Sequence, residues 1–313
     1  MKIELILTGG TIGSTADKND VIDTNPEVTA SMLIDDLYDR HPSYRKSVTF
    51  NASQPIDLLS ENLRLSHWND LIEHLKKVDT KKSRGIIITH GTDTLAFTAN
   101  LLAVLFYGID IPVFLISSSK PLTEKNATGY DNFAKAVDLI RMRTNPSVYV
   151  PIKSKKGKMN VHGGNRLIQS ADLSPDFLSA HHKLNNIGKI HEKLGAEEPL
   201  LYDINRLNAN ILTIAPYPGL DYNNYCLDDV DAVLHRTYHS STVSAGYSDD
   251  YSVLKLKEHC EKKDIPVYFA PLLSTSKKLY RSTDEIIKRG MIPLYDMTFE
   301  MSYIYLLIKH SFM

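Results

Sequence analysis

Two short segments of the chain combine glycines with side chains capable of acyl-transfer chemistry. Residues 8–13 read TGGTIG, and residues 89–94 read THGTDT. A threonine hydroxyl is a nucleophile once a base removes its proton, and glycines let a substrate approach the backbone closely. The second segment also carries a carboxylate, Asp93, for which the α-ammonium group of an amino acid would be a natural partner.

The first segment is open to three interpretations. Gly9, Gly10 and Gly13 loosely resemble a dinucleotide-binding fingerprint. Their spacing differs from G-x-G-x-x-G, however, and no strand ending in an acidic residue follows about 20 residues later. Alternatively, Thr8 and Thr11 present their hydroxyls to a substrate, or Thr11 only caps the turn that follows. The segment alone does not decide among them.

Each segment follows an apolar run that predicts a buried strand of a parallel sheet, at residues 4–7 and 85–88. A helix is expected after the second segment, from about Thr94 to Phe106, and its N-terminus would favour negative charge. Open α/β sheets bind ligands at the carboxyl ends of their strands. Both segments are therefore expected at a ligand-binding edge.

The composition restricts the remaining possibilities. The chain has 313 residues and a formal net charge of −1, which predicts more than one domain and neither a nucleic-acid nor a membrane-surface partner. Cys226 and Cys260 lie far apart without metal-ligand spacing, which indicates free thiols in a reducing compartment. With no apolar run long enough for a bilayer and no signal-peptide pattern, we expect a cytoplasmic protein.

The order of the predicted elements indicates an α/β protein with two domains. Residues 1–190 are expected to form a larger domain with a mainly parallel sheet, including a helix at about 130–142. Residues 191–210 carry charge, Gly195 and Pro199, and are expected to be a linker. Residues 211–313 should form a smaller, doubly wound parallel domain that ends in an amphipathic helix at 298–309.

Taken together, TGGTIG and THGTDT resemble the two signatures of the bacterial-type L-asparaginases and related glutaminases, in the expected order and spacing. Residues 217–219 (YPG) resemble a motif of the cytoplasmic type, and residues 296–300 (DMTFE) resemble the start of the family's last helix. The resemblance implies an asparaginase-like two-domain fold without a metal or organic cofactor. It also implies homodimers or homotetramers, with each site between one protomer's first domain and another's second.

The resemblance further implies hydrolysis of the side-chain amide of L-asparagine, or of a related small amide amino acid, through a threonine acyl-enzyme. Thr11 would be the nucleophile, while Thr92 and Asp93 would hold the substrate and the attacking water. The implied substrate-binding residues are Gly10, Ser53, Gln54, Gly91, Asp93, Tyr238 and Ser240.

Ser53 and Gln54 would bind the α-carboxylate end of the substrate. Tyr238 and Ser240 belong to a segment, residues 235–241 (HRTYHSS), that would reach a neighbouring protomer's site and set specificity, together with His235. From its residue types alone, this segment is equally open to a metal or acid–base site or to simple surface polarity, although no third ligand stands at metal spacing.

The chain departs from the family at two places. The family's loop tyrosine, expected about ten residues after the nucleophile, is missing: residues 15–26 contain none, and Val21 stands near its place. The family's segment Gly-x-Arg-x-x-Lys matches residues 164–169 (GNRLIQ), so Gln169 replaces the lysine as a weakened member of the catalytic group. A neutral amide cannot accept a proton at physiological pH, and losing a general base costs about 10²- to 10⁴-fold in rate.

Other residues could replace the missing groups. Lys120, or a lysine of the run 153–158, could act as the base, and Lys18 or an aspartate of the same loop could replace the tyrosine. Two further functions remain open. One is a catalytically silent relative that binds an amino acid as a sensor or assembly partner, and the other is an amidohydrolase of a larger amide.

Overall fold

The computed structural model describes residues 1–16, 22–24, 26–197, 199–246 and 249–312. The chain forms two compact units, Met1–Ala180 with Ile187–Asn205, and His181–Asn186 with Arg206–Met313. The first contains a large, mainly parallel sheet and the second a smaller parallel sheet. The predicted fold class is therefore confirmed.

The large sheet has the strand order β4-β1-β5-β6-β7-β8. Every neighbouring pair is parallel except β7 and β8, which form an antiparallel hairpin. The carboxyl ends of β1 and β5 consequently lie side by side at one edge, and the end of β6 lies next to that of β5. The strands are β1 (Lys2–Ile6), β4 (Thr49–Ser53), β5 (Ile86–Thr89), β6 (Val113–Ile116), β7 (Val148–Lys153) and β8 (Met159–Gly163).

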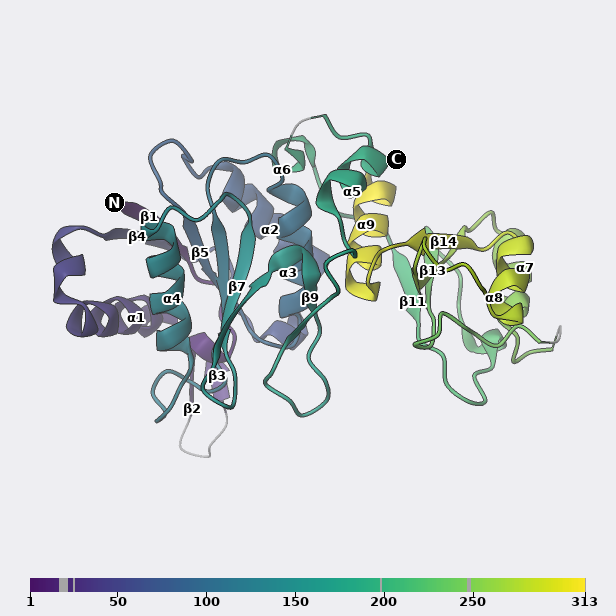
Figure 1. Ribbon diagram of the computed structural model, residues 1–313, viewed down its shortest axis with the longest axis horizontal. Helices are drawn as coiled ribbons and strands as arrows, with labels where there is room; N and C mark the ends of the chain where they lie inside the picture. The colour runs from purple at the N-terminus through teal and green to yellow at the C-terminus, as the bar shows by residue number, and fades with distance from the viewer. Residues whose placement is uncertain (17–21, 25, 198, 247–248, 313) are drawn as a thin grey trace. The chain divides into compact units, whose positions relative to one another are not determined.

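Helices cover both faces of this sheet (Figure 1). Helices α1 (Pro26–Arg40) and α4 (Gly129–Arg141) pack together on one face. Ile3 and Leu5 of β1 belong to the core beneath them, because alternate side chains of a strand point to the same face. On the other face lie α2 (Leu65–Lys76), α3 (Leu95–Leu105), α5 (Ile187–Leu194) and α6 (Leu200–Asp203).

Several short elements connect these helices and strands. The described part of the loop after the first signature forms an antiparallel pair, β2 (Ser14–Ala16) with β3 (Ile22–Thr24). A second pair consists of β9 (Leu167–Ile168) and β10 (Leu178–Ser179). Single 3₁₀ turns occur at η1 (Thr11–Gly13), η2 (Pro42–Lys46), η3 (Ser60–Asn62), η4 (Gly164–Arg166) and η5 (Tyr222–Asn224).

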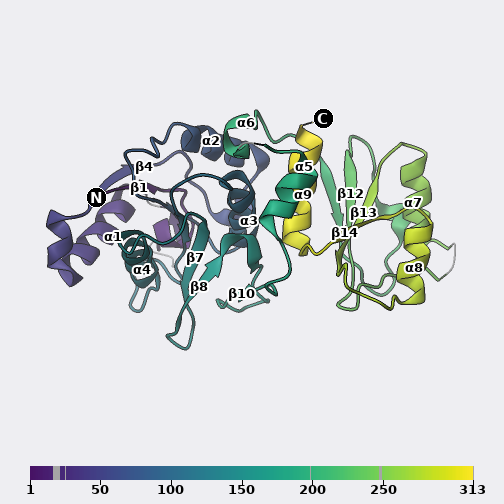
Figure 2. The ribbon, with the colours of Figure 1, turned by 45° about the horizontal axis from the view of Figure 1, so that its top comes forward.

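The second unit is a parallel sheet in the order β11-β12-β13-β14. Helices α7 (Val253–Glu261) and α8 (Arg281–Lys288) lie on one face, and α9 (Phe299–Ser311) lies on the other (Figure 2). Its strands are β11 (Ile211–Ile214), β12 (Ala232–Arg236), β13 (Val267–Leu272) and β14 (Ile292–Tyr295). None of the helices in the described ranges is long and apolar enough to cross a membrane.

One predicted boundary differs from the division into units. Residues 191–205, expected as part of a linker, contain the end of α5 and all of α6, and they belong to the first unit. Buried apolar side chains at Leu200, Leu201 and Ile204 attach this stretch, and the imidazole of His191 is hydrogen-bonded to the carbonyl oxygen of Val104 on α3 (2.7 Å). Charge, glycine and proline in a sequence do not reveal such contacts.

Candidate functional site

Side chains join the carboxyl ends of β1 and β5. The hydroxyl of Thr8 donates to the carbonyl oxygen of Thr89 (2.5 Å), and the backbone N–H of Thr8 donates to the hydroxyl of Thr89 (3.1 Å). Both residues are buried. The hydroxyl of Thr8, one of the two considered for substrate binding, therefore serves to hold the two strand ends together.

Beyond this pair the two signature segments touch through their main chains. A Cβ atom on Gly10 would lie 2.3 Å from the nitrogen of Gly91 and 2.5 Å from its Cα. Gly10 also has a φ of 76°, a conformation that glycine adopts far more readily than other residues. Because Thr11 and Thr92 directly follow these two glycines, the contact brings the predicted nucleophile and the predicted substrate-binding threonine to one place.

Two hydrogen bonds within the turn that carries Thr11 stabilise it. The N–H of Gly13 and the hydroxyl of Ser14 both donate to the carbonyl oxygen of Gly10, at 2.9 and 2.8 Å. Thr11 begins η1 and is partly exposed, as is Thr92 at the other segment. Thr11 and Thr92 thus lie, partly exposed, at the carboxyl edge of the sheet.

Ser60 is the functional candidate that the sequence reasoning missed. This buried serine donates from its hydroxyl to Asp93 Oδ2 (3.0 Å) and accepts the N–H of Asp93 (3.2 Å). Its carbonyl oxygen also accepts the hydroxyl of Thr94 (3.0 Å). A Cβ atom on Gly91 would lie 2.3 Å from Ser60 Oγ, so the serine fits directly against the second signature.

Ser60 thus orients Asp93, whose carboxylate lies just before α3. Asp93 is exposed, so it differs from the buried carboxylate in need of a cationic partner that the sequence suggests. The available sequence signal for Ser60 was the polar triplet Ser60–Asn62, which lies just before α2.

Ser53 and Gln54 lie at the end of β4. The hydroxyl of Ser53 is hydrogen-bonded to Nε2 of His74 on α2 (2.8 Å), and Gln54 is exposed. From there the chain continues along the edge, and Leu58 forms a bridge with Gly9, which brings Ser60 to the second signature. Ser53 and Ser60 occupy different positions around the site, and the contact with Asp93 belongs to Ser60.

A buried relay of hydrogen bonds, from Trp68 through Thr98 to His90, packs against the second signature on its inner side. The indole N–H of Trp68 donates to the hydroxyl of Thr98 (3.0 Å), which is hydrogen-bonded to Nε2 of His90 (2.9 Å). The carbonyl oxygen of Gly91 can only accept, so Nδ1 of His90 donates to it (2.7 Å), and Nε2 of the neutral ring accepts the hydroxyl of Thr98. Burial lowers the pKa of His90, in agreement with this neutral form.

A small cavity lies beside this relay. Its volume is about 10 Å³, at the lower limit for one water molecule, and its lining includes Ser60, Trp68, His90 and Gly91. The second signature is therefore closely packed from the inside.

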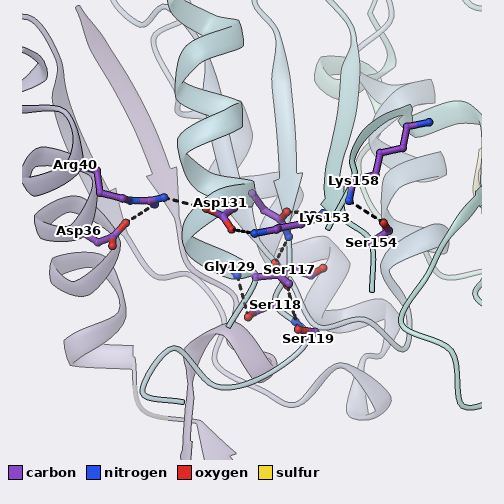
Figure 3. Close-up of polar contacts among 12 residues, drawn as sticks. Asp36, Arg40, Ser117, Ser118, Ser119, Gly129, Asp131, Lys153, Ser154 and Lys158 are labelled. Carbon is purple, nitrogen blue, oxygen red and sulfur yellow. Dashed lines mark hydrogen bonds and ion pairs between the residues drawn. The ribbon is translucent and has the colours of Figure 1, made fainter. Parts of the chain in front are cut away.

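The loop after β6 supports the first signature. A Cβ atom on Gly129, the first residue of α4, would lie 3.2 Å from Cδ1 of Ile12. Ser118 holds this helix start, since its hydroxyl accepts the N–H of Gly129 (3.0 Å) and donates to the carbonyl oxygen of Lys120 (2.5 Å). Figure 3 shows Ser118 beside Gly129.

Two of the lysines considered as replacement bases, Lys120 and Lys153, are engaged in ion pairs. Lys153 Nζ lies 2.6 Å from Asp131 Oδ2, and Arg40 pairs with the other oxygen of that carboxylate at 2.9 Å (Figure 3). Lys120 pairs with Glu124 at 3.5 Å. An ammonium group has no lone pair with which to accept a proton, so neither lysine acts as a base in this arrangement.

Gln169 follows β9, next to the helix that begins after Asp93. The side-chain amide of Asn100 on α3 donates to the carbonyl oxygen of Leu167 (3.0 Å), which attaches this segment to α3. Gln169 is partly buried. Its predicted role in the catalytic group remains a prediction, as do those of Thr11, Thr92 and Asp93.

The predicted specificity residues belong to the second unit. Tyr238 is exposed, and its N–H donates to the carbonyl oxygen of Thr242 (2.9 Å), while the hydroxyls of Ser240 and Thr242 lie 3.1 Å apart. His235, in contrast, is fully buried: Tyr222 donates to its Nε2 (2.8 Å), and its Nδ1 is 2.7 Å from the carbonyl oxygen of Arg236. His235 is therefore a core residue, and burial lowers its pKa to about 4.

The expectations about the missing tyrosine concern residues 15–26. Lys18 and Val21 lie outside the described residues, as do their neighbours from 17 to 21 and residue 25.

Comparison with known proteins identifies the family to which this chain belongs. Residues 2–197 match the family model described as "Asparaginase, N-terminal". The chain belongs to the asparaginase family. The predicted resemblance is thereby confirmed, and the two touching segments are the two signatures of an asparaginase-family amidohydrolase.

Relatives of this asparaginase-family chain carry more than one name. It is 24% identical over 322 residues to a glutamyl-tRNA(Gln) amidotransferase subunit of Aeropyrum pernix, covering 96% of this chain and 73% of that protein. The protein of the same name from Saccharolobus solfataricus is also 24% identical, over 325 residues, covering 98% and 70% of the two chains.

Among solved structures, the thermostable L-asparaginase from Thermococcus kodakarensis aligns with a TM-score of 0.72 at 21% identity, covering 98% of this chain and 92% of that one. The probable cytoplasmic L-asparaginase from Campylobacter jejuni aligns with a TM-score of 0.66 at 20% identity, covering 99% and 98%. Likenesses at this identity establish the fold of the asparaginase-family chain.

Proposed function

We propose that the protein hydrolyses the side-chain amide of a small amino acid, L-asparagine or a close relative, and releases ammonia. The observation that carries this proposal is the main-chain contact between Gly10 and Gly91, which brings Thr11 next to Thr92 and Asp93. In this mechanism the hydroxyl of Thr11 attacks the amide carbon, ammonia leaves, and water then hydrolyses the ester on Thr11.

The chain supplies two further parts of this reaction. The N-terminus of α3 follows Asp93 directly, and its free N–H groups favour negative charge on a bound carboxylate or on a developing oxyanion. Asp93, oriented by Ser60, is placed to bind the α-ammonium group of the substrate. We therefore assign to Ser60 a substrate-binding role that acts through Asp93, distinct from the contact with the α-carboxylate that the sequence led us to expect at Ser53.

The proposed mechanism lacks an effective general base. By the family resemblance Gln169 would take the place of the family's lysine, and an amide side chain cannot take a proton from a hydroxyl. Stabilisation of charge by N–H groups does not depend on that base, so turnover is expected to be slow rather than absent.

Ammonia release from millimolar L-asparagine, L-glutamine and D-asparagine tests the proposal. Thr11→Ala should abolish the release and Thr11→Ser should retain part of it, because serine keeps a hydroxyl. Thr80→Ala, on a loop at the opposite edge of the sheet, is the matched control and should leave the rate unchanged. Gln169→Lys should raise the rate, by up to about 10²-fold, because it restores a basic group.

The proposal fails if neither the wild type nor Gln169→Lys releases ammonia from any of the three substrates. Isothermal titration with the same amino acids then shows whether a silent binding protein remains. Equal release by the wild type and Thr11→Ala would remove Thr11 from the mechanism.

A second candidate follows from the relatives named as amidotransferase subunits, which match 96–98% of this chain. In that case the ammonia would be passed to a partner's substrate instead of being a final product. A clear preference for L-glutamine over L-asparagine in the same assay favours this alternative, and the reverse preference favours simple hydrolysis.

A further inference from the structure

A basic groove lies at the edge of the large sheet opposite the signatures. Its volume is about 780 Å³, and its walls come from the loops that precede the strands. These are the first residues before β1, residues 80–84 before β5, residues 108–112 before β6 and residues 143–146 before β7, together with Pro199 and Tyr202. We call it the amino-edge groove.

The amino-edge groove is positively charged although the chain as a whole has a net charge of −1. Asp110 is the carboxylate found among its described lining residues. Lys82 pairs with Asp79 at 3.0 Å and Lys2 with Glu4 at 2.8 Å, which leaves an excess of positive charge in the groove. The cations that line it are Lys2, Lys81, Lys82, Arg84 and Arg143.

Arg143 is held in a backbone conformation that disfavours it. It follows the end of α4 with a φ of 58°, where helices usually place a glycine because a side chain is strained there. The residue is exposed, and its side chain lines the amino-edge groove. An arginine at this position costs stability that a glycine would not, yet it supplies a cation to the groove.

The same groove contains an aromatic ring. Tyr202 on α6 is 50% exposed, so its ring is available to solvent next to the cations. Proteins that bind single-stranded nucleic acids combine a basic groove, which follows the phosphates, with aromatic rings on which bases stack. An acidic protein surface would use the cations but has no need of the ring.

We propose that the amino-edge groove binds a single-stranded nucleic acid, with the lysines and arginines on its phosphates and Tyr202 stacked on a base. This inference is independent of the amidohydrolase function, because the groove and the signatures occupy opposite edges of the sheet. Net charge alone predicted no such partner, since it does not register how the charges are distributed.

The test is the fluorescence anisotropy of a labelled 20-mer of oligouridine, with oligothymidine in parallel, titrated with the wild-type protein at increasing salt. Phosphate contacts from the three cations outside the groove's two ion pairs, Lys81, Arg84 and Arg143, predict a logarithmic salt slope of about −2.1, and therefore about a 20-fold loss of affinity between 50 and 200 mM salt. Equal binding of both oligomers indicates phosphate recognition, and preference for oligouridine adds recognition of the ribose; either result supports the proposal.

The decisive variant is the triple substitution Lys81→Gln, Arg84→Gln and Arg143→Gly. It should lower the affinity at 50 mM salt and bring the slope close to zero, since the remaining Lys2 and Lys82 are paired with Glu4 and Asp79. Arg143→Gly relieves the strained backbone, so a folding defect is not expected from it. The matched control removes three exposed cations of the second unit, by Lys262→Gln, Lys277→Gln and Lys278→Gln, and should leave both quantities close to the wild type.

Tyr202→Ala should weaken binding about 5- to 100-fold, while Tyr202→Phe should retain it, because stacking needs the ring and not the hydroxyl. The proposal is overturned if the wild type shows no binding at 50 mM salt, or if the groove and control triples lose affinity equally. It is also overturned if an oligoglutamate of equal charge displaces the RNA at the same concentration and Tyr202→Ala has no effect, which would indicate an acidic protein partner.

Discussion

The contact between Gly10 and Gly91 predicts a large effect from a single methyl group. In Gly10→Ala the new Cβ would lie 2.3 Å from the nitrogen of Gly91, whereas an ordinary contact begins at 3.4 Å. The two segments would have to separate by about 1 Å. Misplacement of this size costs about 10²-fold in rate when it separates reacting groups, and overpacking costs about 1–3 kcal/mol of stability.

Gly157→Ala is the matched control for this substitution. Gly157 also has a positive φ, 82°, so a side chain is strained there as well, but nothing lies within 4 Å of the new methyl group. Gly10 has a ψ of 179° and therefore lies in a region open almost only to glycine, which adds backbone strain to the contact. Gly157→Ala therefore shows what a methyl group at a positive φ costs where it meets no neighbour.

Urea unfolding and ammonia release, measured on both variants, test the reasoning. Gly10→Ala should lose more free energy of unfolding than Gly157→Ala, and only Gly10→Ala should lose activity. If the two variants lose the same stability and keep the same rate, the contact does not position Thr11, and the central argument for the site is refuted.

Two further predictions concern Ser60 and His235. Ser60→Ala should lower ammonia release about 10- to 100-fold because Asp93 loses its hydroxyl partner. Ser53→Ala should change the rate much less, because the hydroxyl of Ser53 is hydrogen-bonded to His74 and not to Asp93. Equal effects of the two substitutions would return the substrate-binding role to Ser53. His235 is buried in its neutral form with a pKa of about 4, so the unfolded chain binds its proton more readily, and stability falls as the pH drops from about 6.5 towards 4. The loss, about 3 kcal/mol, should be seen by urea unfolding at pH 7 and pH 4.5 and should shrink in His235→Asn; an unchanged pH dependence in that variant would exclude His235 as its source.

Much of the scaffold could be predicted from the sequence because its signals are local. The helix expected from Thr94 to Phe106 is observed as Leu95–Leu105, and the one expected at 130–142 is observed at 129–141. Apolar periodicity defines such helices, and the glycine-rich segments define the turns between strand and helix. The family followed from the same two segments.

The features that the sequence did not reveal depend on contacts between residues distant in the sequence. Ser53 ends β4 and Ser60 begins η3 further along the chain, and only the bridge between Gly9 and Leu58 shows that Ser60 reaches the second signature. Thr8 and His235 have side chains typical of functional sites, but partners at Thr89 and Tyr222 turn both inward. No periodicity in the sequence reports these pairings.

The meeting of Gly10 and Gly91 also has a consequence for how this chain can change. The spacing of the two threonines is determined by main-chain atoms, and neither glycine contributes a side chain to it. Substrate-facing residues can therefore be exchanged without altering that spacing. A chain built in this way keeps its frame while a different set of proton carriers is installed around it by design.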